Sequence, residues 1–305
     1  MTKKLKLGLA LGSGSARGWS HIGVLNALAE HEIHPDIVCG TSIGALVGAS
    51  YVSNNIPKLD DWVRSLTKFD IAGFFELNRS LNGFVNQKRL HQFLNKYVAD
   101  DALLIEDVDK RYASVSTELA SGREIWHSEG SIVEAVWASI SLPGLFPAIN
   151  NSNRWLVDGG LVNPVPVSVC KALGADVVIA VNLNGDLVGR HFDNTKRSEK
   201  SNNYFGSKMT SLMMEYTGSL LPATRGGQRA PGLFDAMAGS INITQDRITR
   251  SRLAGEPPDI LLAPKLSKIG LLEFYRASEA IEEGEKCVRR ALPEIKEALV
   301  IAEIE

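Results

Sequence analysis

One five-residue turn, residues 40–44, constrains the fold of this chain more than any other stretch. Its sequence, Gly-Thr-Ser-Ile-Gly, matches G-x-S-x-G, a sharp strand-to-helix turn that lifts the hydroxyl of Ser42 above the end of a sheet. Such a turn is strained, and glycines at both ends, Gly40 and Gly44, remove the Cβ atoms that would crowd it. A pattern this short also occurs at plain strand–turn–helix junctions, so further motifs are needed to identify Ser42 as a nucleophile.

A glycine-rich loop lies earlier in the chain, in residues 12–18. The apolar residues 5–11 before it predict a buried strand, and the pattern of residues 19–31 predicts a helix. A dinucleotide site begins in the same way, but the third glycine falls at Gly18, which gives G-x-G-x-x-x-G in place of G-x-G-x-x-G. The acidic residue that would bind the ribose is Asp36, and it leads straight into the strand before the serine turn. A nucleotide site is therefore the weaker interpretation, and the N–H groups of the loop suit an oxyanion as well.

Helix and strand patterns alternate along the chain, which predicts a mostly parallel sheet covered by helices on both faces. The remaining predicted strands are residues 37–39, 112–117 with its hairpin partner 122–126, 155–157, 177–182 and 260–263. The remaining predicted helices are residues 43–54, at least two within 57–111, 132–139, 167–173, 204–221, one after 232, and 272–292. Polar residues 184–203 and the Gly- and Pro-rich residues 222–232 are interpreted as loops. Neither a repeat nor a linker is visible, so a single domain over residues 1–305 is predicted, with a helical C-terminal part over 204–305.

Composition excludes several classes of function. The formal net charge is -2, so no global basic field is available for nucleic acid. Three widely spaced cysteines, Cys39, Cys170 and Cys287, indicate a reducing cytoplasm rather than a disulfide framework. No stretch approaches the ~18 apolar residues of a spanning helix, so contact with a membrane is expected only at its surface. No cluster of residues has metal-ligand spacing, and neither a metal nor another cofactor is expected.

An aromatic-rich segment separates the helices predicted within residues 57–111, with Phe69, Phe74, Phe75 and Phe84. Aromatic clusters mostly serve core packing, and we expect that for most of these side chains. The alternative is an apolar wall or lid over a lipid site.

A carboxylate follows another predicted strand: residues 155–157 end in Asp158, which is followed by Gly159 and Gly160. Because the carboxyl ends of parallel strands meet at one edge of a sheet, we expect the glycine loop, Ser42 and Asp158 to face one crevice. A nucleophile, a base and oxyanion donors are the minimum requirement for acyl transfer.

On these three motifs the chain resembles the bacterial patatin-like phospholipase family. That family has a glycine-rich oxyanion loop ending in Arg-Gly, a G-x-S-x-G turn and a D-G-G/A motif, in this order, and residues 138–147 resemble its A-S-x-S-x-P-x-x-F-P segment. The resemblance covers about residues 7–181. It implies a three-layer α/β/α sandwich with a mostly parallel central sheet, and a Ser–Asp dyad without a histidine.

Carried over to this sequence, the family implies that Ser42 is the nucleophile and Asp158 the base. The N–H groups of Gly14 and Ser15 become the expected oxyanion donors. The full set carried over for the oxyanion hole and substrate binding is Gly12, Gly14, Ser15, Arg17 and Gly18, and the supporting glycines are Gly40, Gly44, Gly159 and Gly160. Ser13 and Ser15 replace glycines of the glycine-richest version, so their side chains are expected to narrow the mouth of the site. Arg17 resembles an arginine that holds the loop or meets a lipid phosphate, and the alternative is a structural ion pair.

The implied function is a serine lipid acyl hydrolase that cleaves carboxylic esters of phospholipids, lysophospholipids or related acyl esters. It would act in the cytoplasm or at the inner membrane surface, without nucleic acid. Three alternatives stay open. One is a regulatory or interaction protein on the same fold with little turnover, and one is a nucleotide-binding protein.

The third alternative is an α/β-hydrolase-type esterase with a Ser–Asp–His triad, in which His191 would complete the chain order. His191 lies in a polar loop with no strand to place it. His127 precedes Asp158, against that order, and His21 is expected to be a packing residue of its helix. The dyad is therefore favoured over the triad.

Overall fold

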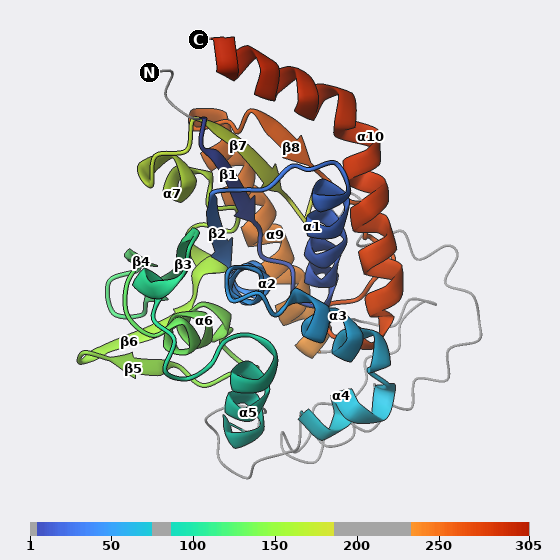
Figure 1. Cartoon of the computed structure of the whole chain (residues 1–305). Coiled ribbons are helices and arrows are strands. Elements are labelled where there is room, and N and C mark those ends of the chain that lie inside the picture. Colours follow the sequence, from blue (N-terminus) through green and yellow to red (C-terminus); the bar gives the residue numbers. More distant parts are fainter. Residues whose placement is uncertain (1–4, 75–86, 186–232, 305) are drawn as a thin grey trace, which may run out of the picture.

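An eight-stranded sheet forms the centre of the protein (Figure 1), in the order β5-β6-β3-β2-β1-β7-β8 with β4 paired to β3 outside this path. The computed structural model describes residues 5–74, 87–185 and 233–304. The parallel strands are β1 (Leu7–Leu11), β2 (Ile37–Thr41), β3 (Arg111–Glu118), β7 (Val177–Val181) and β8 (Ile260–Leu262). The antiparallel strands are β4 (Glu124–His127), β5 (Ile149–Asn151) and β6 (Arg154–Asp158). The predicted α/β fold with a mostly parallel sheet is confirmed.

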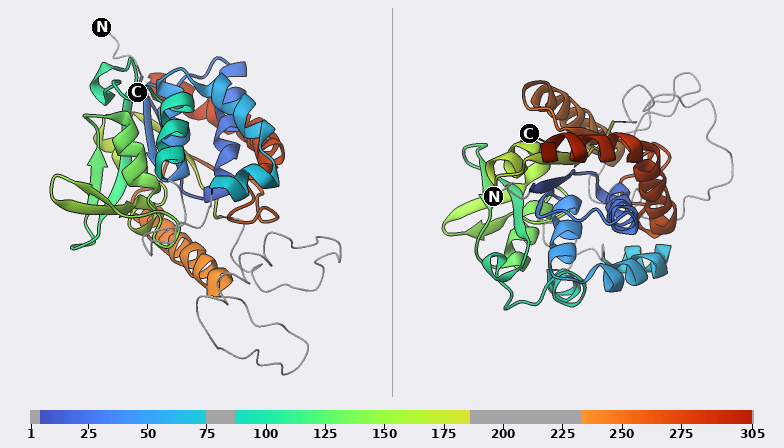
Figure 2. Two further views of the ribbon diagram at one scale, coloured as in Figure 1. Left: turned by 90° about the horizontal axis from the view of Figure 1, so that it is seen from below. Right: turned by 45° about the horizontal axis from the view of Figure 1, so that its top comes forward.

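Helices cover both faces of the sheet, which gives three layers (Figure 2). The larger apolar core lies on the face covered by α1 (Ser20–Glu30), α2 (Ile43–Val52), α6 (Ile132–Ile140) and α10 (Ala277–Ile304), with α3 (Ile56–Ser65), α4 (Lys68–Phe74) and α5 (Gln87–Tyr97) beyond them. The smaller core lies under α7 (Val167–Ala172) and the end of α9 (Leu233–Gly255). Short 3-10 turns connect these elements: η1 (Ser15–Trp19), η2 (Ile105–Asp107), η3 (Gly159–Leu161) and η5 (Phe274–Arg276).

The two-residue period of β1 explains why the two cores differ in size. Leu7, Leu9 and Leu11 face the larger core, whereas Gly8 and Ala10 face α7. A Cβ on Gly8 would lie 2.7 Å from the Cβ of Ala175, so the loop after α7 approaches the strand closely. Small residues on one side and leucines on the other therefore fix which face carries the thicker helical layer.

One expectation from the sequence, the end of the last helix, needs correction. α10 runs through Pro293 to Ile304, although the sequence predicted an end at Leu292. A proline removes one helical hydrogen bond, but buried Ile295 packs into the core two residues later and keeps the helix on its path. Phe69 is 84% exposed, so it is not among the aromatic side chains of its segment that pack in the core.

Strand β5 was not predicted, because its sequence Ile-Asn-Asn has little apolar alternation. It pairs with β6 through Ser152 and Asn153, whose φ angles of 50° and 66° belong to the tight turns that join antiparallel strands. The side chains of Phe74, Phe75 and Phe84, and the elements predicted over residues 186–232, lie outside what the structure describes. Among the described residues, no helix combines the length and apolar character needed to cross a membrane.

Candidate active site

Ser42 occupies a strained turn between β2 and α2. Its φ of 56° and ψ of -124° lie in a region that residues with a side chain rarely adopt. The two flanking positions also have no space for a side chain. A Cβ on Gly40 would lie 2.4 Å from Ala45 N, and one on Gly44 would lie 2.1 Å from Leu11 O. The sequence motif therefore corresponds to a turn that only glycine permits at both ends.

Ser139 holds this turn against the sheet. Its Oγ accepts a hydrogen bond from the Ser42 N–H at 2.8 Å and donates one to Val115 O of β3 at 2.6 Å. Both Ser139 and Val115 are fully buried. The sequence identified the segment 138–147 by resemblance but assigned no role to this hydroxyl, because nothing local links it to residue 42.

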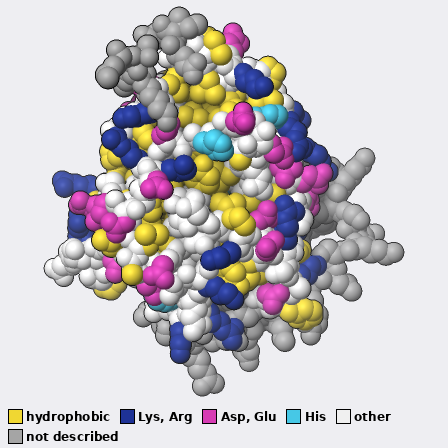
Figure 3. Space-filling view, viewed as in Figure 1, with side chains coloured by type: hydrophobic (Ala, Val, Ile, Leu, Met, Phe, Trp, Pro, Cys, Tyr) yellow, Lys and Arg dark blue, Asp and Glu magenta, His cyan; other side chains and the backbone are white. Residues whose placement is uncertain are grey.

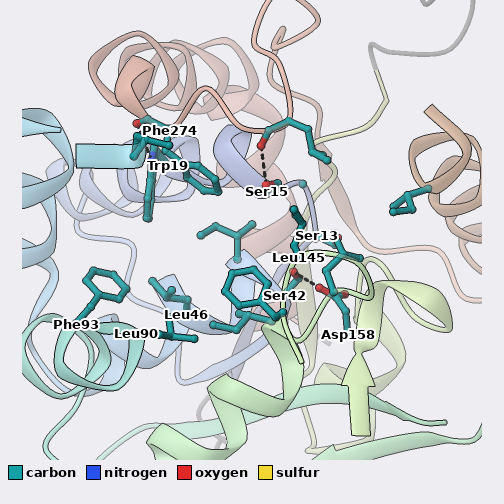
Figure 4. A pocket seen from close by; sticks show the side chains of 18 of the residues that line it. Ser13, Ser15, Trp19, Ser42, Leu46, Leu90, Phe93, Leu145, Asp158 and Phe274 are labelled. Atoms are coloured by element: carbon teal, nitrogen blue, oxygen red, sulfur yellow. Dashed lines mark hydrogen bonds between the residues drawn. The ribbon is translucent and has the colours of Figure 1, made fainter. Parts of the chain in front are cut away.

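Ser42 and Asp158 are in direct contact. Ser42 Oγ donates a hydrogen bond to Asp158 Oδ2 at 2.5 Å (Figure 4), and the Gly160 N–H donates one to Asp158 Oδ1 at 2.7 Å. Asp158 is only 1% exposed. Burial raises its pKa to about 6, against the opposing effect of the two hydrogen bonds from Ser42 and Gly160. The carboxylate thus has one oxygen fixed by backbone and the other facing the serine.

Asp158 reaches Ser42 by a route different from the expected one. The sequence predicted that its strand would run parallel to the others and deliver the carboxylate at its carboxyl end. Instead β6 is antiparallel to β3, with Asp158 opposite Ser116. β6 therefore begins beyond the carboxyl end of β3 and runs back toward it. Asp158, the last residue of β6, thus lies near the carboxyl ends of the parallel strands. The predicted meeting place is correct, and the strand direction behind it was wrong.

Two N–H groups of the glycine loop differ from the rest in their hydrogen bonding within the described part of the chain. Backbone carbonyls accept hydrogen bonds from the N–H groups of four other loop residues, which are Gly12, Ser13, Ala16 and Arg17. Among the described residues, neither the Gly14 N–H nor the Ser15 N–H has an acceptor, and both residues line the same pocket as Ser42. These are the two groups that the resemblance implied as oxyanion donors.

The two serines of the loop differ in their orientation. Ser15 has a φ of 52°, a glycine-like conformation, and its hydroxyl donates to Leu271 O at 2.7 Å, away from Ser42. Ser13 lines the pocket beside Asp158 (Figure 4). A Cβ on Gly160 would lie 2.8 Å from Ser13 Oγ, so this hydroxyl sits close to the Asp-Gly-Gly turn. Of the two replacements, the Ser13 hydroxyl lies nearer the reacting groups.

Arg17 is buried beneath the loop, with 1% of its surface exposed. Its Nε donates to Gly14 O at 3.2 Å and its Nη2 donates to Asn242 Oδ1 at 2.8 Å. Burial lowers its pKa to about 10. In the described part of the chain its hydrogen-bond partners are a carbonyl and an amide, rather than the carboxylate of an ion pair. Gly18, the last glycine of the loop, packs against Ile43, since a Cβ there would lie 2.2 Å from Ile43 Cγ2.

Histidines are not part of the site, as far as the structure describes them. His21 Nε2 bonds to Gly12 O at 2.8 Å, and His127 Nε2 bonds to Ser116 Oγ at 2.7 Å. Burial lowers the pKa of both imidazoles to about 4, so both are neutral at pH 7. No described histidine hydrogen-bonds Ser42 or Asp158, and His191 lies outside the described residues.

The pocket above Ser42 has a polar end and an apolar end (Figure 4). Its cavity volume is about 120 Å³. The polar end consists of Ser13, Gly14, Ser15, Ser42, Asp158 and Gln245. The apolar end extends between α2, α3 and α5, and its lining includes Leu46, Trp62, Leu66, Ile71, Leu90 and Phe93. Such a pocket fits a molecule with a reactive polar group at one end and a hydrocarbon chain at the other.

Asp36 does not belong to this site. It lies at the opposite edge of the sheet, where its Oδ2 accepts a hydrogen bond from the Leu7 N–H at 3.0 Å. A nucleotide held by the glycine loop would therefore lack its ribose partner. Among the described residues, no group of three His, Cys, Asp or Glu side chains could hold a metal ion. Acidic and basic side chains are interspersed over the described part of the face in Figure 3.

Comparisons with known proteins show which proteins this chain resembles. The family model described as patatin-like phospholipase matches residues 9–171. An NTE family protein of Mycobacterium bovis is 30% identical, with 94% of this chain and 91% of that protein covered. Patatin-like phospholipase domain-containing protein 6 of Mus musculus is 32% identical over 58% of this chain and 13% of its own length. Among solved structures, VipD from Legionella pneumophila aligns with 95% of this chain and 66% of its own, at 16% identity and a TM-score of 0.45.

Proposed function

The chain belongs to the patatin-like phospholipase family, and we propose that it is a serine hydrolase of lipid acyl esters with Ser42 and Asp158 as its dyad. Membership supports lipid acyl hydrolysis in general. The observation that carries the dyad is the 2.5 Å hydrogen bond from Ser42 Oγ to buried Asp158, at the polar end of an apolar pocket. The proposed substrates are carboxylic esters of phospholipids, lysophospholipids or related compounds.

Acylation begins when Ser42 Oγ attacks the ester carbonyl carbon and its proton passes to Asp158 Oδ2. The carbonyl oxygen becomes an oxyanion, which accepts hydrogen bonds from the N–H groups of Gly14 and Ser15. Collapse of this tetrahedral intermediate breaks the ester C–O bond, and the proton on Asp158 is returned to the leaving alcohol oxygen. Water then attacks the acyl-enzyme by the same steps and releases the fatty acid.

The buried position of Asp158 suits this role. A carboxylate is a weak base toward a serine hydroxyl, and a pKa of about 6 makes Asp158 a stronger base than an exposed aspartate. Asp158 must be ionised to accept the proton, so kcat/KM is expected to fall as the pH drops below about 6. The oxyanion donors must still supply most of the stabilisation of the transition state, because the pKa values of the serine hydroxyl and the carboxyl group remain far apart.

The apolar end of the pocket accounts for the lipid substrate. Trp62 stacks on Tyr97 with ring centroids 5.1 Å apart and also contacts Phe93, so aromatic contacts hold this wall together. A hydrocarbon chain in this pocket would leave its carbonyl carbon beside Ser42. Each buried methylene contributes about 0.8 kcal/mol, which favours acyl chains over short esters.

The decisive experiment combines covalent labelling with hydrolysis. A fluorophosphonate probe is expected to label the wild type, and Ser42→Ala is expected to abolish labelling and to lower kcat toward the background, by about 10⁶-fold. Ser53→Ala is a matched control, because Ser53 follows the same helix and its buried hydroxyl has no partner among the described residues. It should label and turn over as the wild type does.

Each alternative function predicts a different outcome. A folded wild type that neither labels nor hydrolyses acyl esters would support a regulatory or interaction protein and overturn the proposal. Loss of hydrolysis in His191→Ala would replace the dyad by a triad, in which Asp158 orients the histidine. A folded wild type that is not labelled at Ser42 but binds a nucleotide saturably would instead favour the nucleotide-binding alternative.

A further inference from the structure

Helix α9 lies outside the stretch matched by the family model, yet it reaches the glycine loop with two buried polar side chains. We propose that Asn242 and Gln245 of α9 are positioning residues that aim the two oxyanion donors at the substrate. The proposal rests on the proposed function, since it concerns the same oxyanion. It adds a role for the C-terminal part of the chain, for which the sequence motifs predict none.

The geometry of the peptide bond connects α9 to the donors. In a planar trans peptide the C=O and the N–H point in opposite directions, and no cis peptide occurs in the described chain. The Gly14 N–H shares its peptide with the carbonyl of Ser13, and the Ser15 N–H shares its peptide with the carbonyl of Gly14. A group that holds either carbonyl from behind therefore fixes the direction of the corresponding N–H in front.

The first connection runs through Arg17. Its Nε donates to Gly14 O at 3.2 Å, and its Nη2 donates to Asn242 Oδ1 at 2.8 Å. Because the guanidinium is planar and rigid, the hydrogen bond at Nη2 also fixes the direction of the bond at Nε, and Asn242 supplies the acceptor for Nη2. Through Arg17, Asn242 therefore fixes the orientation of the peptide that carries the Ser15 N–H.

The second connection runs through Asn184, which follows β7. Its Nδ2 donates to Ser13 O at 3.4 Å and to Gln245 Oε1 at 3.2 Å. Its backbone N–H is bonded to Asn182 Oδ1, so the residue itself is anchored. Gln245 therefore acts on the peptide that carries the Gly14 N–H, one residue before the peptide under Asn242.

Burial makes these contacts specific. Asn242 and Gln245 are 8% and 4% exposed, and a buried amide that loses its partner cannot turn to water instead. Thr249, further along α9, is equally buried, but its hydroxyl has no partner among the described residues. Asn242 and Gln245 thus differ from the charged residues further along α9. There Arg250 pairs with Asp246 and Arg252 pairs with Glu124, and none of these contacts involves the glycine loop.

The central test is Asn242→Leu, which keeps the size of the side chain and removes the acceptor for Arg17. The expected result is a kcat lower by about 10- to 100-fold with little change in KM, because the donors act on the transition state while the acyl chain is bound by the apolar pocket. The inhibition constant of a trifluoromethyl ketone, which forms a hemiketal oxyanion on Ser42, should rise by a similar factor.

Asn242→Asp is the rescue variant, because its carboxylate oxygen again accepts from Arg17; it should restore most of the lost kcat. Thr249→Val is the matched control on the same helix and should leave kcat, KM and inhibition unchanged. Gln245→Met tests the second connection independently, and a loss of kcat is expected. Thermal unfolding checks that each variant folds, so Gln245→Met still tests the proposal if Asn242→Leu does not fold.

The outcomes separate this inference from the function on which it rests. If the wild type hydrolyses acyl esters while folded Asn242→Leu and Gln245→Met keep its kcat, α9 has no positioning role and the inference is wrong. If Asn242→Asp is as slow as Asn242→Leu, the loss is structural and the inference is also wrong. If Ser42 of the wild type does not react with the fluorophosphonate probe and the wild type hydrolyses no acyl ester, the proposed function itself fails.

Discussion

The two ends of the pocket are built in opposite ways. The polar end depends on single atoms, such as Ser42 Oγ and Asp158 Oδ2 at 2.5 Å, contributed by segments more than 100 residues apart. The apolar end depends on the volume enclosed by side chains of neighbouring helices, α2, α3 and α5. A change at the polar end should therefore alter the rate of the chemical step. A change at the apolar end should alter which substrate reacts.

The largest expected effect at the polar end, after removal of Ser42, belongs to Asp158→Asn. The asparagine keeps the shape of the side chain but cannot take the proton of Ser42. We expect kcat to fall by about 10³- to 10⁴-fold in a long-chain ester assay. His127→Gln is the control, because its imidazole contacts Ser116 instead, and it should remain active. Similar losses in both variants would contradict the Ser–Asp assignment.

The same substitution should make the protein more stable. In the folded chain the pKa of Asp158 is about 6, above its ordinary value of 3.8, so the native state holds the proton more tightly than the unfolded state. Ionisation therefore weakens the native state as the pH rises from about 4 to about 6, and the full penalty persists at pH 7. Asp158→Asn should raise the free energy of unfolding at pH 7 by about 2–3 kcal/mol.

Urea unfolding of both proteins from pH 4 to pH 8 measures this difference. The gain should shrink as the pH falls below 6 and vanish near the ordinary aspartate pKa. A constant gain at all pH values would show that the carboxylate charge is not its cause.

The apolar end is tested by Leu90→Trp, which fills part of the chain-binding volume. Since each methylene contributes about 0.8 kcal/mol, wild-type kcat/KM should rise up to about fourfold per added carbon until the pocket is full. In Leu90→Trp this rise should stop at a shorter chain, with short esters still hydrolysed at the wild-type rate. Gln92→Trp places the same ring on the exposed side of α5 and should keep the wild-type profile. An unchanged profile in Leu90→Trp would place the acyl chain elsewhere.

The contrast between the two ends also explains what could be read from the sequence. The serine turn, the glycine loop and the Asp-Gly-Gly turn were visible because each depends on backbone geometry that glycine alone permits, as at Gly40 and Gly44. The confirmed fold follows from the alternation of strands and helices. The assignment of Ser42, Asp158 and the loop to catalytic roles stays a prediction, and so does a single domain over residues 1–305.

The features that could not be predicted from the sequence depend on contacts between residues far apart in the chain. Ser139 and Asn242 carry no local signal, because a serine or asparagine that binds a remote partner resembles one that faces water. The direction of β6 was missed since a short apolar run reads the same in a parallel or antiparallel pair. The exposed position of Phe69 could not be singled out, because apolar composition predicts burial only on average.

The absence of a side chain at Gly18 has a consequence for motion. Gly18 ends the glycine loop and packs directly on Ile43, the residue that follows Ser42, and Gly44 packs on Leu11 O, just before the loop begins. Loop and serine turn therefore share a surface with no space for independent displacement. Local opening of the native state should expose both to hydrogen exchange as one cooperative unit. The distance from Ser42 Oγ to the N–H groups of Gly14 and Ser15 is therefore expected to change little during thermal fluctuation.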